Sequence, residues 1–319
     1  MKTFLMLAAA AVATPPVKPA LAPSEIVAAA PKGDWVAIAP ADLLVMDLAN
    51  GKRVVIQLMP PPFSQGWVGN IRKLAAAHWW DGTSINRVQD NYVVQWGDAT
   101  EKKALPSGLA TVLESEYSLP QTLEVRDFFA RKLKSEEGKL LAAFATKGGA
   151  AKVRAISLAI PRDPYSDETA SYNGWAIAKD NERIWPVHCY GMVGVGRDMP
   201  PNTGTGAELY TVIGHAPRHL DRNIALVGRV ISGIEHLSSL PRGTGDLGFY
   251  KTPEERTGII SVRIGSDVAG LPRYEYLSTE SASFAKYADA RAKRRDPFFI
   301  VPAGGADICN IPVPVRVAK

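Results

Sequence analysis

The sequence predicts a mainly β protein that carries an inserted segment and a C-terminal helical extension. The first observation is Asn50-Gly51, which lies between the apolar runs 43–46 and 54–56 and is a strong short-range signal for a β-hairpin. The second is a strand-rich block over residues 187–232. The third is the segment 259–264 (IISVRI), in which residues 259, 261 and 263 alternate with the apolar residues 260, 262 and 264 and predict one further strand.

Length and composition are those of an ordinary globular protein with one large domain or two modest ones. The chain has 319 residues, of which 46% are hydrophobic and 22% are charged, with 27 Gly, 24 Pro and two Cys. These values exclude low complexity, a collagen-like repeat and a disulfide-dense miniprotein. The formal net charge of +5 is mild for this length, so no nucleic-acid partner is indicated. Beyond the N-terminus no apolar run approaches the ~18 residues of a membrane-spanning helix, so stable membrane insertion is not expected.

The N-terminus is similar to a secretory signal peptide. Lys2 precedes the unbroken apolar run 4–13, which is too short to span a bilayer and is followed at once by prolines. Small-residue cleavage sites end at Ala13 and at Ala22, and we take residues 1–22 as the signal peptide. We therefore expect export.

The two cysteines, Cys189 and Cys309, would then lie in an oxidising compartment and could pair. Two buried thiols that never meet are the alternative. The sequence leaves both open.

The elements before residue 100 follow from turn and helix signals. Residues 23–38 are rich in Ala and Pro and indicate a linker in front of the hairpin. After three consecutive prolines, Ser64 is a candidate N-cap, and the spacing of the apolar residues predicts an amphipathic helix over 65–79. Two short strands are expected at 84–88 and 92–96.

Two segments differ in character from the strand-rich blocks. Residues 122–182 indicate an insertion, in which 124–144 mix charged and apolar residues at a helical period and 160–181 are rich in turn formers. Residues 269–319 indicate a C-terminal extension with a helix over 280–295. The basic residues that end this helix are typical of a solvated helix terminus.

Motifs of common cofactor and metal enzymes are missing or lack their context. The segment 243–248 (GTGDLG) has the GxGxxG spacing, but no strand precedes it and no helix follows it, so a dinucleotide site is not expected. His215 and His219 have the spacing of a zinc-binding helix, but Pro217 separates them and the HExxH glutamate is missing. GxSxG and the Walker A loop do not occur. We expect neither a cofactor nor a metal.

Two strings carry a family resemblance, RVQDNYVVQWGD at 87–98 and GMVGVGRDMPPNTGTGAELYTVIGHAPRHLDRNIALVGRV at 191–230. With the hairpin and the helix before them, they resemble the cyclophilin-type peptidyl-prolyl cis-trans isomerases. The resemblance covers roughly 39–98 and 186–268. It implies a closed eight-stranded antiparallel β-barrel capped by two helices, which we place at 39–268.

The same resemblance implies an activity and a place of action. Members of this family accelerate rotation about X-Pro bonds in proline-containing polypeptides, without a cofactor. The chain is most similar to an exported bacterial branch of the family. This implies a periplasmic isomerase that assists the folding of exported proteins.

Site residues are implied position by position. The family pattern R-x-x-x-x-[FY]-x-x-Q-x-G-D places the catalytic arginine at Arg87 and its glutamine partner at Gln95. The aromatic wall of the proline pocket falls on Tyr92, and the next pocket residue on Val93. The other substrate-binding positions implied by the resemblance are Gly196, Arg197, Glu208, Tyr210, His219, Leu220 and Ile224.

Three positions depart from the family pattern. Val93 replaces a methionine, His219 replaces a tryptophan that helps to bind cyclosporin in the best-known members, and Ile224 occupies a site that is often histidine. These departures and the long insertion support a second hypothesis, a proline-binding or chaperone-like module with weak turnover. Arg87 favours the enzyme, because binding alone does not require a donor aimed at the prolyl nitrogen.

The expected chemistry needs few groups. An X-Pro bond rotates slowly because amide resonance gives a barrier of about 18–20 kcal/mol. A fixed guanidinium can donate to the prolyl nitrogen as rotation localises its lone pair, and this interaction is stronger in the transition state. The sequence defines neither the client proteins, nor the residue preferred before proline, nor the oligomeric state.

Overall fold

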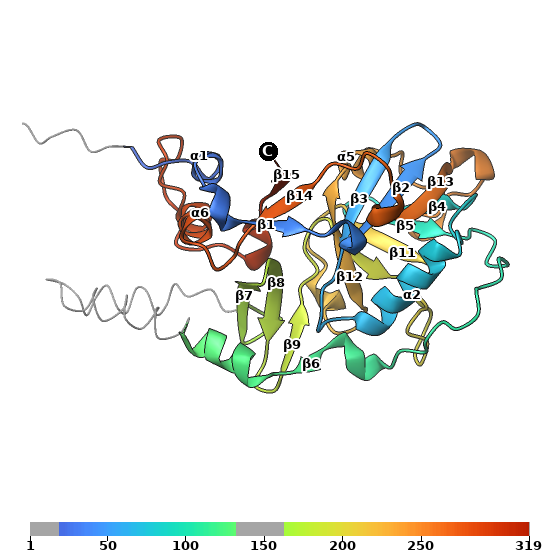
Figure 1. The fold of residues 1–319 in the computed structure, drawn as a ribbon, viewed down its shortest axis with the longest axis horizontal. Helices are drawn as coiled ribbons and strands as arrows, with labels where there is room; N and C mark the ends of the chain where they lie inside the picture. The colour runs from blue at the N-terminus through green and yellow to red at the C-terminus, as the bar shows by residue number, and fades with distance from the viewer. Residues whose placement is uncertain (1–18, 132–162, 319) are drawn as a thin grey trace, which may run out of the picture.

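The computed structural model describes residues 19–131 and 163–318. A β-barrel occupies one end of the molecule, and two smaller sheets lie at the other end together with helices α1 and α6 (Figure 1). The prediction of a mainly β protein is confirmed. In the described part of the chain, no helix combines the length and the apolar character needed to cross a bilayer.

Eight antiparallel strands close the barrel in the order β10-β11-β5-β4-β13-β2-β3-β12. The predicted hairpin is β2 and β3, and the two strands expected before residue 100 are β4 and β5. The sequence therefore predicted the barrel and these four strands. The strands are β2 (Leu43–Leu48), β3 (Arg53–Leu58), β4 (Ser84–Val88), β5 (Val93–Gly97), β10 (Met192–Val195), β11 (Leu209–Val212), β12 (Leu226–Ser232) and β13 (Thr257–Ile264).

Strand β2 is apolar on both faces because both faces are covered. Leu44 and Met46 point into the main core, whereas Leu43 and Val45 belong to a second core with Tyr274 from outside the barrel. A strand buried on both faces shows a continuous apolar run instead of alternation. This explains the unbroken run at 43–46.

Helix α2 (Gln65–Ala76) packs on the barrel through Trp67, Ile71 and Leu74, all of them fully buried. It ends three residues before the predicted boundary. Ser64 occupies the N-cap position, as expected, but its side chain makes no capping hydrogen bond. The second helix of the barrel is the single turn α5 (Glu235–Ser238), whose Leu237 reaches the main core.

A second sheet has the order β6-β9-β8-β7. The predicted insertion, 122–182, contains β7 and β8, whereas β6 and β9 flank its boundaries. Residues 160–181, expected to be rich in turns, include the hairpin of β7 and β8, because Asn173 and Gly174 both have positive φ (47° and 82°) and make a two-residue turn. Of the helix expected at 124–144, residues 123–131 are helical and the remainder lies outside the described residues. The strands are β6 (Leu119–Pro120), β7 (Glu168–Tyr172), β8 (Trp175–Lys179) and β9 (Arg183–Pro186).

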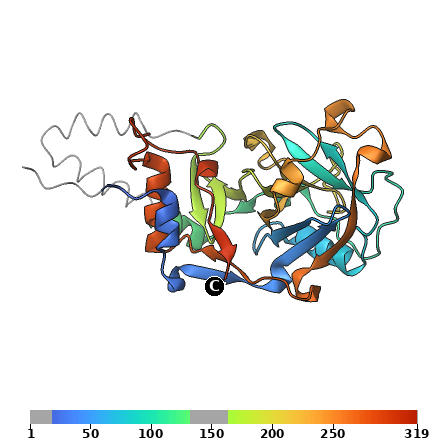
Figure 2. The ribbon, with the colours of Figure 1, turned by 90° about the horizontal axis from the view of Figure 1, so that it is seen from above.

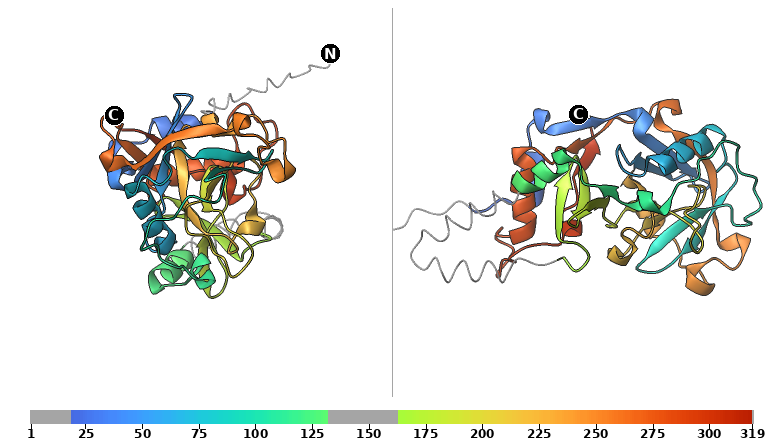
Figure 3. Two further views of the ribbon diagram at one scale, coloured as in Figure 1. Left: turned by 90° about the vertical axis from the view of Figure 1, so that its right-hand side faces the viewer. Right: turned by 90° about the horizontal axis from the view of Figure 1, so that it is seen from below.

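Residues 23–38 are not the linker that we expected. They form α1 (Pro23–Ala28) and β1 (Trp35–Ile38), and β1 pairs with β14 (Tyr274–Leu277), which pairs with β15 (Val315–Val317). The predicted helix of the extension is α6 (Ala282–Lys293), which lies beside α1 (Figures 2 and 3). Apolar residues explain the correction, since Trp35 packs with Leu277, Phe284 and Tyr287 in a small core of their own.

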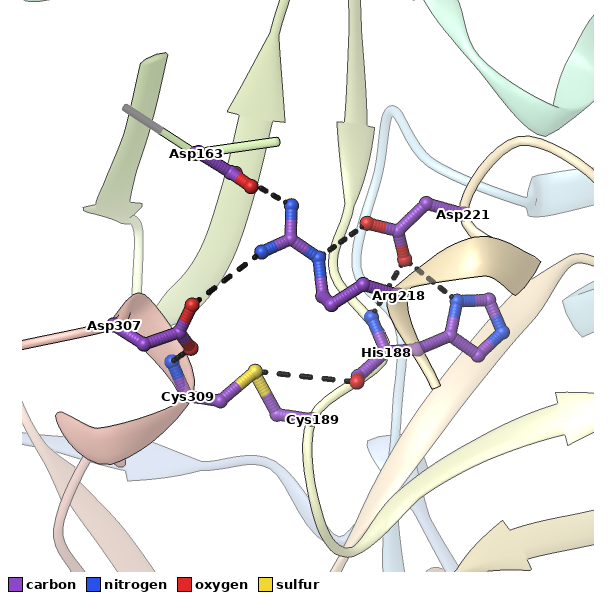
Figure 4. Close-up of a disulfide and its surroundings, with 7 residues drawn as sticks. All are labelled: Asp163, His188, Cys189, Arg218, Asp221, Asp307 and Cys309. Carbon is purple, nitrogen blue, oxygen red and sulfur yellow. Dashed lines mark hydrogen bonds and ion pairs between the residues drawn. A yellow bond between two sulfur atoms is a disulfide. The ribbon is translucent and has the colours of Figure 1, made fainter. Parts of the chain in front are cut away.

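A disulfide between Cys189 and Cys309 joins the barrel side of the molecule to the C-terminal extension (Figure 4). Their Cα atoms are 5.1 Å apart, which is within the range that a disulfide spans. Of the two possibilities that the sequence left open, the structure therefore shows the disulfide and not two separate thiols. The bond ties the extension to the residues that follow β9.

Removing this disulfide should destabilise the folded protein. The two cysteines are 120 residues apart in sequence, and a cross-link over a loop of that length restricts the unfolded chain strongly, by about 2–5 kcal/mol. We expect the double variant Cys189→Ala/Cys309→Ala to have a free energy of unfolding that is lower by that amount, and therefore to unfold at a lower urea concentration. Reduced and alkylated wild-type protein is the control. Equal midpoints for the variant and the oxidised wild type would contradict the expectation.

Candidate functional site

One row of residues crosses four neighbouring strands of the barrel. Arg87 on β4 is paired with Gln95 on β5, Gln95 with Tyr210 on β11, and Tyr210 with Gly194 on β10. Residues that are directly opposite in antiparallel strands point to the same face of a sheet. Arg87, Gln95 and Tyr210 accordingly line one cavity of about 570 Å³.

The wall of this cavity beside Arg87 is apolar. Val93, Tyr210 and Val212 are buried together, and Tyr92 and Ile224 pack against them from the more exposed side. An apolar wall next to a cation suits a pyrrolidine ring, because the ring has no polar group of its own to satisfy.

The guanidinium of Arg87 is held in place from three directions. Its Nε donates to the carbonyl of Leu247 at 2.8 Å, its Nη1 donates to Gln95 Oε1 at 3.3 Å, and its Nη2 donates to Gln89. Burial lowers the pKa of Arg87 below its ordinary value. An arginine nevertheless stays charged at neutral pH, so the site contains a fixed and poorly hydrated cation.

A glycine-rich loop covers one side of that cation. The loop is residues 243–250, and it lies against β4 because Gly243 N donates to the carbonyl of Val88 and Tyr250 N donates to that of Asn86. A Cβ at Gly248 would meet the Cα of Gln89 at 2.6 Å, so only glycine fits there. The GTGDLG string is therefore part of a loop that packs against β4.

Glu208 is an acidic group in the same cavity, next to Gln95. Burial raises the pKa of Glu208, whereas hydrogen bonds from Asn86 and Gln95 act in the opposite direction. Its carboxylate occupies the space above Gly97, where a Cβ would lie 1.8 Å from Oε1. The lining thus includes a partly desolvated carboxyl group that can titrate above the usual range.

The structure brings almost all of the predicted site residues together. His219 is the exception: it is exposed and does not line the cavity, but its ring lies nearly parallel to that of Tyr92, with 6.4 Å between centroids. The predicted residues that line the cavity are Arg87, Tyr92, Val93, Gln95, Gly196, Arg197, Glu208, Tyr210, Leu220 and Ile224.

Arg197 is held against the backbone near the cavity. Its guanidinium donates to the carbonyl of Asn223 at 3.1 Å and to that of Asp198 at 2.6 Å. The side chain therefore ties the 196–198 segment to the turn that carries Ile224, while the backbone of Gly196 stays on the cavity wall.

Sequence reasoning missed several residues of the lining. Phe249 lies 5.2 Å from the Arg87 guanidinium, measured to its ring centroid, and Tyr250 is beside it. Their signal was the aromatic pair that follows the GTGDLG string, but the string was considered only as a cofactor motif. Among the described residues, no cluster of three or more His, Cys, Asp or Glu side chains could hold a metal ion.

Comparison with known proteins agrees with this geometry. The family model described as "Cyclophilin type peptidyl-prolyl cis-trans isomerase/CLD" matches residues 46–264, more than half of the chain. The chain therefore belongs to the cyclophilin family, and it is a peptidyl-prolyl cis-trans isomerase by that membership. A comparison with curated protein sequences finds no match.

A search of solved structures finds one with the same fold and others of lower similarity. The cyclophilin AquaCyp293 from Hirschia baltica is 20% identical, with a TM-score of 0.59, over 89% of this chain and 94% of its own. A cyclophilin-type isomerase from Cryptosporidium parvum, solved in the presence of the dipeptide Ala-Pro, is 10% identical, with a TM-score of 0.38, over 70% of this chain and 98% of its own.

The raised pKa of Glu208 predicts a specific pH dependence of stability. Because the folded chain holds this proton more tightly than the unfolded chain, protonation stabilises the fold. The gain is complete below the ordinary value of 4.5 and is lost as the pH rises through the folded pKa. We expect wild type to gain a few degrees in Tm relative to Glu208→Gln between pH 7 and 4.5.

The control for this measurement is Glu182→Gln, which changes an exposed carboxylate away from the cavity. Its curve of Tm against pH should follow that of wild type. A Glu208→Gln curve that also stays parallel to wild type over this range would contradict the prediction.

Proposed function

We propose that Arg87 accelerates rotation about X-Pro bonds by donating a hydrogen bond to the prolyl nitrogen. The observation that carries this proposal is the placement of Arg87 beside the apolar wall of Val93 and Tyr210, with its guanidinium held by Leu247 and Gln95. A donor that is already oriented needs no reorganisation when the nitrogen becomes pyramidal.

The proposal assigns complementary tasks to the other lining residues. Tyr92, Val93, Tyr210 and Leu220 hold the proline ring, and Gln95 orients both Arg87 and the substrate carbonyl. A ten-thousandfold acceleration needs about 5.5 kcal/mol. One charge-assisted hydrogen bond supplies about 1.5–3 kcal/mol of that, so the dry apolar wall supplies the remainder.

Arg87→Ala should remove most of the catalysis. Loss of a hydrogen bond worth about 1.5–3 kcal/mol in the transition state lowers kcat/KM roughly 10- to 150-fold. The measurement is cis/trans exchange of an Ala-Pro peptide, followed by NMR at equal enzyme concentrations.

Arg53→Ala is the matched control, because Arg53 forms an exposed pair with Asp47 across β2 and β3. It should exchange the peptide as fast as wild type. If wild type and Arg87→Ala both bind the peptide but exchange it slowly, the barrel is the proline-binding module of the second hypothesis, and the proposed mechanism is wrong.

We further propose that the protein is exported and assists the folding of exported proteins in the periplasm. The apolar run 4–13 after Lys2 supports this, and so does the disulfide, because disulfides persist in oxidising compartments. The substrates would be proline-containing segments of proteins that arrive unfolded in that compartment.

Export predicts a shorter mature chain. Expressed in a bacterium with its own N-terminus, the protein should be recovered from the periplasmic fraction with a mass that lacks residues 1–13 or 1–22. Cleavage at Ala22 would remove the Ala22 N–H that donates to Glu25 Oε2 at 2.7 Å at the start of α1, whereas cleavage at Ala13 would keep it. A full-length mass in the cytoplasmic fraction would contradict export.

A further inference from the structure

A buried histidine outside the cavity contacts the back of its wall. His188 follows β9 and is 1% exposed. Its Nε2 is 2.9 Å from the hydroxyl of Tyr210, and its Nδ1 is 2.9 Å from Asp221 Oδ1. The two rings are nearly parallel, at an interplanar angle of 10°. His188 is therefore a neighbour of the pocket that reaches it only through Tyr210.

The contact with Asp221 fixes which nitrogen of the ring carries the hydrogen. The same carboxylate oxygen also accepts from the backbone N–H of His188 at 2.9 Å. Because a carboxylate only accepts hydrogen bonds, Nδ1 must donate to it. In the neutral ring, Nε2 is then an acceptor, and the Tyr210 hydroxyl donates to it.

Asp221 is itself fixed by a further charge. Arg218 Nε donates to Asp221 Oδ2 at 2.6 Å, and its Nη2 donates to Asp163 Oδ2 at 2.7 Å (Figure 4). Both Arg218 and Asp221 are buried. The acceptor that faces Tyr210, Nε2 of His188, is therefore held in place by Asp221, which is held in turn by Arg218.

The tyrosine ring can reach this acceptor because of a glycine. Tyr210 is paired with Gly194, and a Cβ at Gly194 would meet the phenolic oxygen at 2.3 Å. The hydroxyl therefore passes over β10 and leaves the cavity. Burial raises the pKa of Tyr210 well above its ordinary value, so the phenol keeps its proton.

We propose that His188 is a positioning residue for the proline pocket, which it keeps apolar by binding the Tyr210 hydroxyl outside it. Without this acceptor, the hydroxyl would donate to a water molecule that reaches it from the cavity. That water would be displaced when a proline ring enters, leaving a buried donor unpaired. The proposal deepens the function proposed above and rests on it.

The test compares three variants and a control by NMR titration with an Ala-Pro peptide. In His188→Asn the amide can still donate to Asp221, but the acceptor for Tyr210 is lost. Tyr210→Phe removes the hydroxyl and keeps the ring. The third variant combines both changes. His236→Asn, on the one-turn helix α5, is the matched histidine control.

We expect His188→Asn to weaken peptide binding roughly 5-fold or more, whereas His236→Asn binds as wild type. Adding Tyr210→Phe to His188→Asn should restore the Kd to about that of Tyr210→Phe alone, since no hydroxyl is left without a partner. A purely structural role for His188 would give no such rescue. Failure of the rescue, or wild-type affinity in His188→Asn, overturns the proposal.

A second measurement does not depend on the folding of any His188 variant. In wild type labelled with ¹⁵N-histidine, a saturating peptide should shift the Nε2 resonance of His188, and Tyr210→Phe should abolish this response. An unchanged resonance overturns the proposal. The cis/trans exchange of the peptide is followed in the same wild-type samples. If the peptide binds but its exchange is not accelerated, the proposed catalysis is wrong. The test of His188 still holds in that case, because it measures binding.

Discussion

One buried cation, the guanidinium of Arg218, forms ion pairs that connect separate parts of this molecule. Arg218 is 4% exposed in its side chain, and its three nitrogens face three carboxylates from different regions of the chain: Asp163 from the insertion, Asp221 beside the barrel and Asp307 from the extension. Burial lowers the pKa of Arg218, but the two closer carboxylates outweigh burial and raise it. A buried charge without partners would be strongly destabilising, so the insertion and the extension stay where these carboxylates can reach it.

One part of the cavity wall is connected to the same ion pairs. The barrel places Arg87, Gln95 and Tyr210 in one row through strand register alone, and this part of the site needs nothing beyond the barrel. The back of Tyr210, by contrast, depends on His188 and Asp221, which are held by the network around Arg218. The environment of Tyr210 therefore depends on residues from several elements. A phenol in the pocket wall requires a glycine beneath it and an acceptor behind it, and this chain supplies both.

The sequence predicted the barrel, its first hairpin, α2 and a set of site residues of which all but His219 line the cavity, because strands and family blocks are encoded by neighbouring residues. It failed where a structure depends on residues that are distant in sequence. Residues 23–38 have a linker composition, yet Trp35 has a core to enter once β14 and α6 are present. His188 has no local signal of function, because it acquires its role through Tyr210 on another strand. Phe249 follows the GTGDLG string, but its place beside Arg87 depends on the pairing of that loop with β4. The Asn173-Gly174 turn was readable locally and was overlooked.

The order in which the chain is made has a consequence for the sheet of β1, β14 and β15. Strand β1 is synthesised before the barrel, whereas β14 and β15 follow it, so β1 has no partner strand while the barrel is being completed. During that interval its unpaired backbone and Trp35 can associate with other nascent chains. Any truncation that removes residues 315–317 would leave β14 without one of its two neighbours, although β1, β14 and the barrel are all present. The three-stranded sheet is therefore a part of the fold that can be completed only when the C-terminal strand is available.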